Sequence, residues 1–173
     1  MLIVTQFCLL VKSWKGYTTP MQSFAFVPYF QTTRYRVEAM IALADITPLD
    51  SIADLGSGDG RIVIAFAQKG IVAHGFELNR TLLEKSQQEI DKLALQKKLQ
   101  KENAVIYAKD FWQENLSRYS IITMYPMPDI MDALERKLQE ELRPEARVLL
   151  NYYSFPNWKE EKKQDNIYVY IKR

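Results

Sequence analysis

The sequence predicts an α/β fold: a single Rossmann-like, doubly wound domain with a mainly parallel sheet and an antiparallel C-terminal strand. Three observations predict it. Short apolar runs typical of buried strands alternate with longer amphipathic runs typical of helices along most of the 173 residues. A cluster of glycines separates the first such strand from the helix after it. The alternating run 167–171 closes the chain without a helix before it, which favours an antiparallel last strand.

The first elements are a helix and then a strand–turn–helix–strand unit. Residues 33–44 repeat apolar side chains at helical spacing, and Pro48 ends this helix. The short apolar run 52–55 is typical of a buried strand. Residues 61–69 are apolar on most sides, which predicts a helix covered by other elements. The run 72–77 predicts the second strand.

The alternation continues through the second half of the chain. Residues 80–95 form an amphipathic helix, and the runs 104–108 and 121–125 predict the third and fourth strands. Residues 129–142 predict another helix, and the fifth strand, 147–153, is rich in Val, Leu and Tyr. Strands that alternate with helices form a parallel sheet covered on both faces. The carboxyl ends of such strands meet at one edge, where ligands of open α/β sheets bind.

The composition argues against several classes of function. Lys and Arg number 23 against 21 acidic residues, so a formal charge of +2 gives no reason to expect a nucleic-acid surface. The single cysteine, Cys8, excludes an internal disulfide and a cysteine-based zinc site, which fits a reducing compartment and a cytoplasmic location. The single histidine, His74, lies inside an apolar run and is expected to be a structural strand residue. No metal site is expected.

The strongest signal is the glycine-rich segment 54–61, between a strand and a helix. Its glycines let the backbone turn sharply and let a ligand approach closely. The third glycine, Gly60, comes one position earlier than in the dinucleotide fingerprint G-x-G-x-x-G, and Arg61 holds the dinucleotide position. The spacing after an acidic residue resembles instead the first motif of class I S-adenosylmethionine (SAM)-dependent methyltransferases. The candidate SAM-binding residues here are Asp54, Gly56, Ser57, Gly58 and Gly60.

Two further carboxylates follow the next two strands. Glu77, beside Leu78, can accept hydrogen bonds from both ribose hydroxyls of SAM. Asp110 can accept from the adenine amino group, while Phe111 or Trp112 covers the ring. Each carboxylate alone is equally well explained as a solvated strand end. Their coincidence with successive strand ends predicts a SAM site, and a nicotinamide cofactor is disfavoured by the glycine spacing.

The remaining segments resemble a narrower group of these enzymes. It is the group of protein-lysine methyltransferases that includes the mitochondrial ATP synthase c-subunit lysine methyltransferase and its archaeal and bacterial relatives. The matching stretches are 26–28, 54–62, 76–79, 137–148, 155–158 and 168–170. The resemblance implies a protein lysine ε-amino group as methyl acceptor. The chain departs from the group's pattern at 27–33, which is longer, and at 158–167, where a late strand is expected to be reduced.

The acceptor site is expected where the fourth and fifth strands end. Tyr125 is the first candidate to line a lysine channel, with Asn151, Tyr152 and Tyr153 beside it. The segment after the fourth strand lacks the Asn/Asp-Pro-Pro-Tyr/Phe tetrad of amino-directed base methylation. Ordinary strand packing explains these tyrosines equally well. Two other functions stay open: a small-molecule or nucleic-acid methyltransferase on the same fold, and a non-catalytic SAM-binding partner subunit.

The first residues are expected to form a separate element. Residues 1–25 are predicted as a hydrophobic and aromatic arm, and 26–173 as the methyltransferase domain. The apolar run 1–11 falls short of the ~20 residues that span a bilayer. Lys, Trp and Tyr follow it directly, a mixture that suits a membrane interface. Peripheral membrane contact through residues 1–17 therefore stays open beside an arm packed on the domain or a disordered tail. The oligomeric state is not predicted.

Overall fold

The computed structural model describes residues 29–173, of which Gln31–Arg173 form one compact unit. The predicted arm 1–25 and its membrane contact through 1–17 lie outside the described residues. The strands are β1 (Ser51–Leu55), β2 (Val72–Phe76), β3 (Ala104–Tyr107), β4 (Ile121–Met124), β5 (Arg147–Asn151), β6 (Lys162–Gln164) and β7 (Ile167–Ile171). The α-helices are α1 (Arg34–Ala44), α2 (Arg61–Ala67), α3 (Arg80–Leu95) and α4 (Met131–Glu141). None of the helices among these residues is long and apolar enough to cross a membrane.

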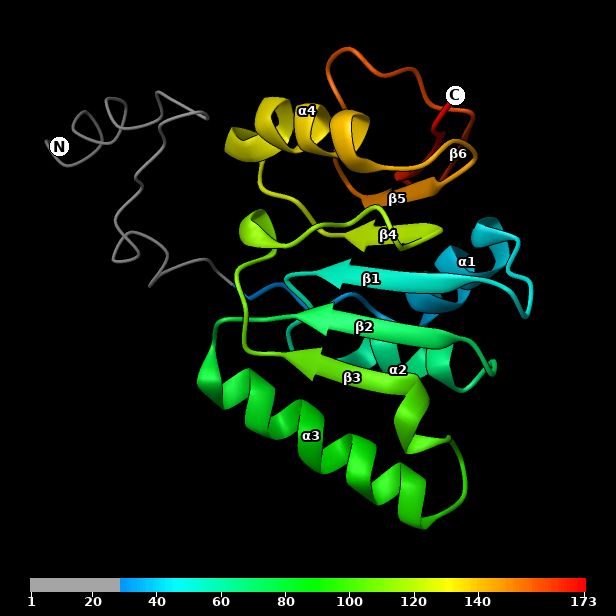
Figure 1. Cartoon of the computed structure of the whole chain (residues 1–173), viewed down its shortest axis with the longest axis vertical. Coiled ribbons are helices and arrows are strands. Elements are labelled where there is room, and N and C mark those ends of the chain that lie inside the picture. The colour runs from blue at the N-terminus through cyan, green and yellow to red at the C-terminus, as the bar shows by residue number, and fades with distance from the viewer. Residues whose placement is uncertain (1–28) are drawn as a thin grey trace, which may run out of the picture. The chain divides into compact units, whose positions relative to one another are not determined.

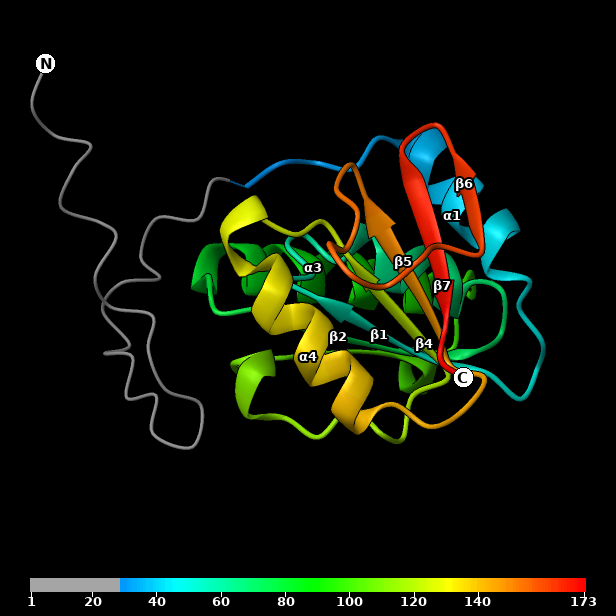
Figure 2. The same ribbon diagram turned by 90° about the horizontal axis from the view of Figure 1, so that it is seen from above.

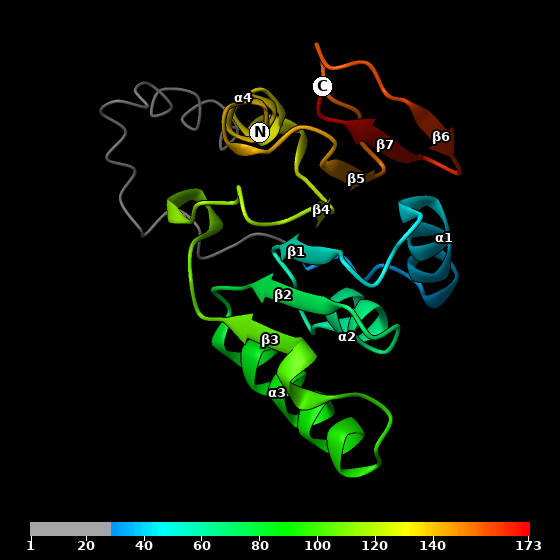
Figure 3. The same cartoon turned by 45° about the vertical axis from the view of Figure 1, so that its right-hand side comes forward.

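The strands form one sheet in the order β3-β2-β1-β4-β5-β7-β6 (Figure 1). Neighbours from β3 to β5 pair in parallel, whereas β7 pairs antiparallel with β5 and with β6. Figure 3 shows β6 and β7 beyond β5 and α3 beyond β3. The chain reverses its direction of winding between β1 and β4, and this switch point is where open α/β sheets bind ligands. The predicted doubly wound fold with an antiparallel C-terminal strand is confirmed.

Side-chain alternation along the strands divides the core between the two faces of the sheet. Ile52 and Ile121 pack with α1, α2 and α3 in one cluster, and their neighbours Ala53 and Ile122 pack with α4 in the other. Figure 2 shows α4 on one side of the sheet and α1 and α3 on the other. Both faces of the sheet are therefore covered, which explains why its strands read as continuous apolar runs.

The predicted elements are all present, but several are shorter than expected. The fifth strand ends at Asn151, not at residue 153, because Tyr152 adopts a left-handed conformation (φ 73°) and its N–H donates to the Asn166 carbonyl, 2.7 Å away. The helix expected from residue 129 begins at Met131, after a 3₁₀ turn at Pro128–Ile130. Where a reduced late strand was expected, the structure has the three-residue strand β6.

Candidate active site

The glycine loop between β1 and α2 is held in a left-handed backbone conformation. Gly56, Gly58 and Gly60 have φ of 73°, 57° and 78°. The N–H groups of Gly56 and Ser57 both donate to the Phe76 carbonyl at 3.0 Å, which fastens the loop to the end of β2. A Cβ on Gly60 would come within 2.6 Å of Ile106 Cδ1, whereas a Cβ on Gly56 would meet no atom of residues 29–173 within 4 Å. Gly60 is therefore required for packing, and Gly56 leaves space for a ligand at the carboxyl edge.

Glu77 lies at the end of β2 and binds the glycine loop through its carboxylate. Its Oε2 accepts from the Gly58 N–H at 2.8 Å, and its Oε1 accepts from the N–H groups of Leu78 and Asn79 at 2.9 and 2.7 Å. These three bonds fix both carboxylate oxygens beside the loop, where a ribose would lie. Leu78 is 51% exposed, so an apolar surface is available next to this carboxylate. The role of Glu77 toward a ribose stays a prediction.

Asp110 lies after β3 and opens a 3₁₀ turn, Phe111–Gln113. Its Oδ1 accepts from the Trp112 N–H at 3.0 Å, so the carboxylate is fixed by its own turn. The Phe111 and Trp112 rings lie 4.9 Å apart between centroids and pack against the α4 side of the core. This turn follows Tyr107, which pairs with Phe76 just before Glu77. The predicted adenine residues therefore lie one strand beyond the predicted ribose residue.

Asp54 and Ser57 are candidate cofactor residues with buried polar side chains. Asp54 Oδ1 accepts from Thr123 Oγ1 on the neighbouring strand at 2.8 Å. Burial raises the pKa of Asp54 to about 7, and the Glu77 and Asp59 carboxylates act in the same direction, while the Thr123 hydrogen bond opposes it. Ser57 Oγ is buried and has no hydrogen-bond partner among residues 29–173. It lies against Gly75, where a Cβ would come within 2.5 Å of it, so this hydroxyl packs inside the loop.

The sequence analysis missed an ion pair between Asp59 and Arg61, at the end of the glycine loop. Arg61 donates to both carboxylate oxygens of Asp59, at 2.8 and 2.6 Å, and to the Thr32 carbonyl at 2.9 Å. Lys85 Nζ lies 3.5 Å from the same carboxylate. The sequence Asp-Gly-Arg at 59–61 could have predicted this ion pair, because it places an acidic and a basic residue two positions apart. The sequence analysis used these residues only for the glycine spacing. The loop is thereby tied to the segment before α1.

The strand register brings the two halves of the site together. Leu55 of β1 pairs with Met124 of β4, and Met124 pairs with Leu150 of β5. Gly56 and Tyr125 are therefore the first residues after β1 and β4, and Asn151 is the last residue of β5, so the three lie at the same carboxyl edge, with adjacent strands ~4.8 Å apart. The cofactor candidates on β1 to β3 and the acceptor candidates on β4 and β5 meet at the topological switch point.

The acceptor candidates form an aromatic cluster with a cation. The Tyr125 and Tyr152 rings stack with 5.2 Å between centroids and 17° between planes, and Arg36 Cζ lies 4.4 Å from the Tyr152 centroid. Burial raises the pKa of Tyr125. The neighbouring phenol groups of Tyr152 and Tyr153 raise this pKa further, and the Arg36 guanidinium lowers it. Arg36 was not singled out in the sequence, because 115 residues separate it from Asn151, to which it bonds.

Asn151 does not line an open channel, contrary to its predicted role. It is fully buried, and both ends of its side-chain amide are occupied. Its Oδ1 accepts from Arg36 Nε and Nη2 at 2.8 and 2.5 Å, and its Nδ2 donates to Thr32 Oγ1 at 3.3 Å. Asn151 therefore orients Arg36 beside Tyr152, and direct contact with a substrate is left to the tyrosines.

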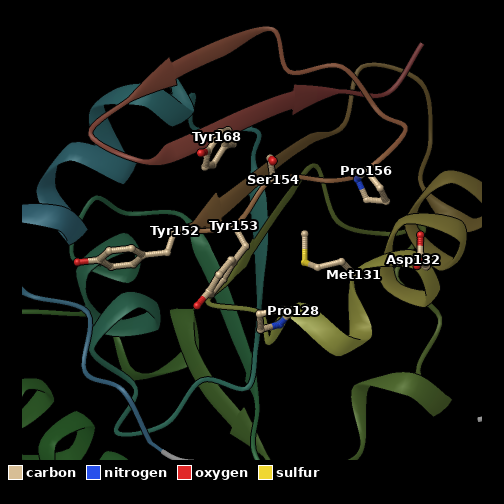
Figure 4. Close-up of a pocket in the computed structure, with 8 residues that line it drawn as sticks. All are labelled: Pro128, Met131, Asp132, Tyr152, Tyr153, Ser154, Pro156 and Tyr168. Atoms are coloured by element: carbon tan, nitrogen blue, oxygen red, sulfur yellow. The ribbon is translucent and has the colours of Figure 1, made fainter. Parts of the chain in front are cut away.

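Tyr153 faces a pocket of about 460 Å³ next to this cluster. Figure 4 shows the Tyr152 and Tyr153 rings leaving the end of β5 in different directions. The residues that line the pocket are mainly apolar and aromatic, with one carboxylate and one hydroxyl: Pro128, Met131, Asp132, Tyr152, Tyr153, Ser154, Pro156 and Tyr168. Tyr152 belongs both to this lining and to the aromatic cluster. Among the described residues, no group of His, Cys, Asp and Glu could hold a metal ion.

The strand order, the glycine loop and the carboxylates after three successive strands define a class I SAM-dependent methyltransferase fold. The chain is similar to the solved structure of an RNA methyltransferase from Salinibacter ruber in complex with S-adenosylhomocysteine (SAH). The TM-score is 0.73 at 26% identity, and the match covers 82% of this chain and 91% of that one. A SAM-dependent methyltransferase from Thiobacillus denitrificans, also in complex with SAH, shares the fold with a TM-score of 0.58 at 17% identity, covering 72% and 52%.

The chain belongs to the ANTKMT methyltransferase domain family, whose pattern matches residues 54–162. It is 34% identical to the human ATP synthase c-subunit lysine N-methyltransferase over 142 residues, 82% of this chain and 58% of that protein. It is 30% identical to a protein-lysine N-methyltransferase of Saccharolobus islandicus over 134 residues, 76% and 80%. The mouse adenine nucleotide translocase lysine N-methyltransferase is 33% identical, over 76% and 56%. The chain spans little more than half the length of its human relative, and the predicted family is confirmed.

Proposed function

We propose that this chain is a SAM-dependent protein-lysine N-methyltransferase. One observation carries the proposal: β1 and β4 end in register, so the glycine loop that begins at Gly56 and the aromatic cluster that begins at Tyr125 follow adjacent strands. A cofactor site and an acceptor site that share one edge of the sheet are what group transfer between two bound molecules requires. The names of the relatives supply the acceptor class, a lysine in a protein.

The cofactor is held by backbone and carboxylates. SAM supplies an electrophilic methyl group on a sulfonium when it is bound. We expect Glu77 to accept from the ribose hydroxyls and Asp110 to accept from the adenine amino group, with Leu78 and Phe111 as apolar neighbours of the base. A Cβ built on Gly56 would meet no described atom within 4 Å, which supports a ligand close to this position. The fit rests on the space beside Gly56 and on two carboxylates already fixed in place by backbone N–H groups.

The acceptor amine must be neutral to attack a methyl group. An acceptor lysine that packs against the stacked rings of Tyr125 and Tyr152 would lose part of its hydration, and desolvation disfavours a lysine ammonium. The Arg36 guanidinium beside the same rings repels a second positive charge, which lowers the pKa of an approaching lysine further. Asn151 keeps Arg36 in this position. Alignment of the two reactants contributes most of the remaining catalysis, up to about 7–11 kcal/mol in favourable cases.

An RNA acceptor is the second candidate, because the Salinibacter ruber relative in the same fold is named an RNA methyltransferase. The charge balance of this chain favours a protein acceptor, since a formal charge of +2 provides little attraction for a phosphate backbone. A non-catalytic SAM-binding protein is the third. In such a protein the aromatic cluster would have no acceptor to bind.

The test is methyl transfer by the purified chain. Methyl-labelled SAM is incubated with the chain and an undermethylated host extract, split into soluble and membrane fractions, with Glu77→Ala as the inactive control. We expect label on a discrete protein, mapped by mass spectrometry to lysine, and none with the control. Label on RNA would contradict the lysine assignment and keep the fold. SAM binding without transfer would favour the non-catalytic protein. Label confined to the membrane fraction would support membrane contact through residues 1–17.

A further inference from the structure

Lys137 is buried and forms an ion pair with the partly buried Glu141, and none of the chemistry above uses this pair. Both residues lie on α4, one helical turn apart, and Lys137 is only 3% exposed. Its Nζ donates to Glu141 Oε1 at 2.6 Å, to the Glu114 carbonyl at 2.9 Å and to the Trp112 carbonyl at 3.3 Å. The ammonium group thus uses all three of its N–H donors, and two of them donate to backbone carbonyls of one segment distant in the sequence.

That segment is residues 110–116, here called the base loop. The second oxygen of Glu141 accepts from the Leu116 N–H at 2.9 Å, so the pair binds the base loop at three backbone positions. The loop begins with Asp110 and carries the Phe111 and Trp112 rings, the side chains placed around the adenine. Apart from one 3₁₀ turn it has no regular secondary structure, so its position depends on these contacts.

A gain in folding stability alone does not explain why a charged residue occupies position 137. Two charges removed from water are often no more stabilising than apolar side chains of the same volume. An apolar residue at position 137 would fill the space, but it could not fix two carbonyl groups and orient Glu141 toward Leu116. The ion pair therefore specifies where the base loop lies.

We propose that Lys137 and Glu141 are positioning residues that hold the base loop where it recognises the adenine of SAM. The proposal rests on the proposed function, because it requires SAM to bind at this edge of the sheet.

The test compares two ligands that differ only in the base. Calorimetry measures the Kd of SAH and of its inosine analogue, in which a carbonyl replaces the adenine amino group. We expect Lys137→Met to weaken SAH about tenfold, the effect of misplacing one hydrogen bond to the base, and to leave the analogue nearly unchanged. Discrimination between the bases, the ratio of the Kd of the inosine analogue to the Kd of SAH, then falls by the same factor. The KM for SAM should rise while kcat at saturating SAM stays within twofold.

The matched control is Lys172→Met, since Lys172 Nζ bonds Gln139 of the same helix at 2.9 Å instead of the base loop. It should keep the wild-type discrimination. Glu141→Gln keeps an acceptor and a similar shape, and it serves where Lys137→Met does not fold. Wild-type discrimination in a folded Lys137→Met or Glu141→Gln protein would overturn the positioning role alone. A wild-type chain that binds no SAH would overturn the proposed function and the positioning role together.

Discussion

Alanine at three glycines separates the packing role of the loop from its role in ligand binding. Gly56, Gly60 and Gly70 all have φ between 73° and 87°, so a Cβ costs each about 1–2 kcal/mol of backbone strain. Only at Gly60 does the new methyl group also collide, at 2.6 Å from Ile106 Cδ1 and 2.9 Å from Ser86 Cβ. The first contact can relax by rotation of the isoleucine, but the second is fixed to the backbone of α3.

The magnitudes follow from these contacts. Overpacking of this kind costs about 1–3 kcal/mol, so Gly60→Ala should lose about 2–5 kcal/mol of unfolding free energy. Gly56→Ala and Gly70→Ala, whose Cβ atoms meet nothing within 4 Å, should each lose only the ~1–2 kcal/mol of strain. Gly56→Ala should in addition weaken SAH at least tenfold, because its methyl group enters the space left for the ligand. Gly70 lies at the far end of α2, so Gly70→Ala should bind SAH normally.

The assay is urea denaturation of the three variants, followed by calorimetric titration of SAH into each folded protein. Equal losses of stability at Gly60 and Gly70 would refute the packing argument. Wild-type SAH affinity in Gly56→Ala would refute the assignment of the open side of the loop to the cofactor.

Two other predictions concern charge. Since burial raises the pKa of Asp54 to about 7 from an ordinary 3.8, the folded protein holds a proton between pH 4 and 7 that the unfolded chain has lost. The free energy of unfolding should therefore fall by roughly 4 kcal/mol as the pH rises across that range. Urea denaturation should show that the unfolding free energy of Asp54→Asn depends less on pH. The same pH dependence in the variant and the wild type would contradict this. Arg36→Gln should move the rising limb of the kcat–pH profile to higher pH, because the bound acceptor amine loses a repelling charge, and an unmoved profile would remove Arg36 from the acceptor site.

The sequence predicted the fold and the cofactor edge because both depend on local patterns. Apolar periodicity located each α-helix and each strand except the polar, exposed β6, and the glycine spacing needed only the strand before it and the helix after it. Glu77 and Asp110 were found for the same reason, since each follows a strand that the pattern already located. Their roles toward SAM stay predictions that the binding experiments test.

The acceptor side was harder to predict because it depends on contacts between distant residues. Tyr152 continues an aromatic, strand-forming run, but its pairing with Asn166 turns the backbone left-handed and ends the strand. The burial of Asn151 follows from Arg36 and Thr32, both more than 110 residues away. No periodic pattern encodes such contacts. Lys137 is a similar case, because a lysine on a helix is ordinarily exposed and here the base loop covers it.

The most direct test of the central claim is a calorimetric titration of SAH into the wild-type chain and into Glu77→Ala. The account predicts one-to-one binding to the wild type. It predicts at least tenfold weaker binding to the variant, which loses the ribose acceptor and the three bonds that fix the loop and the end of β2. Equal SAH affinity in the two folded proteins would contradict the placement of the cofactor at this edge of the sheet.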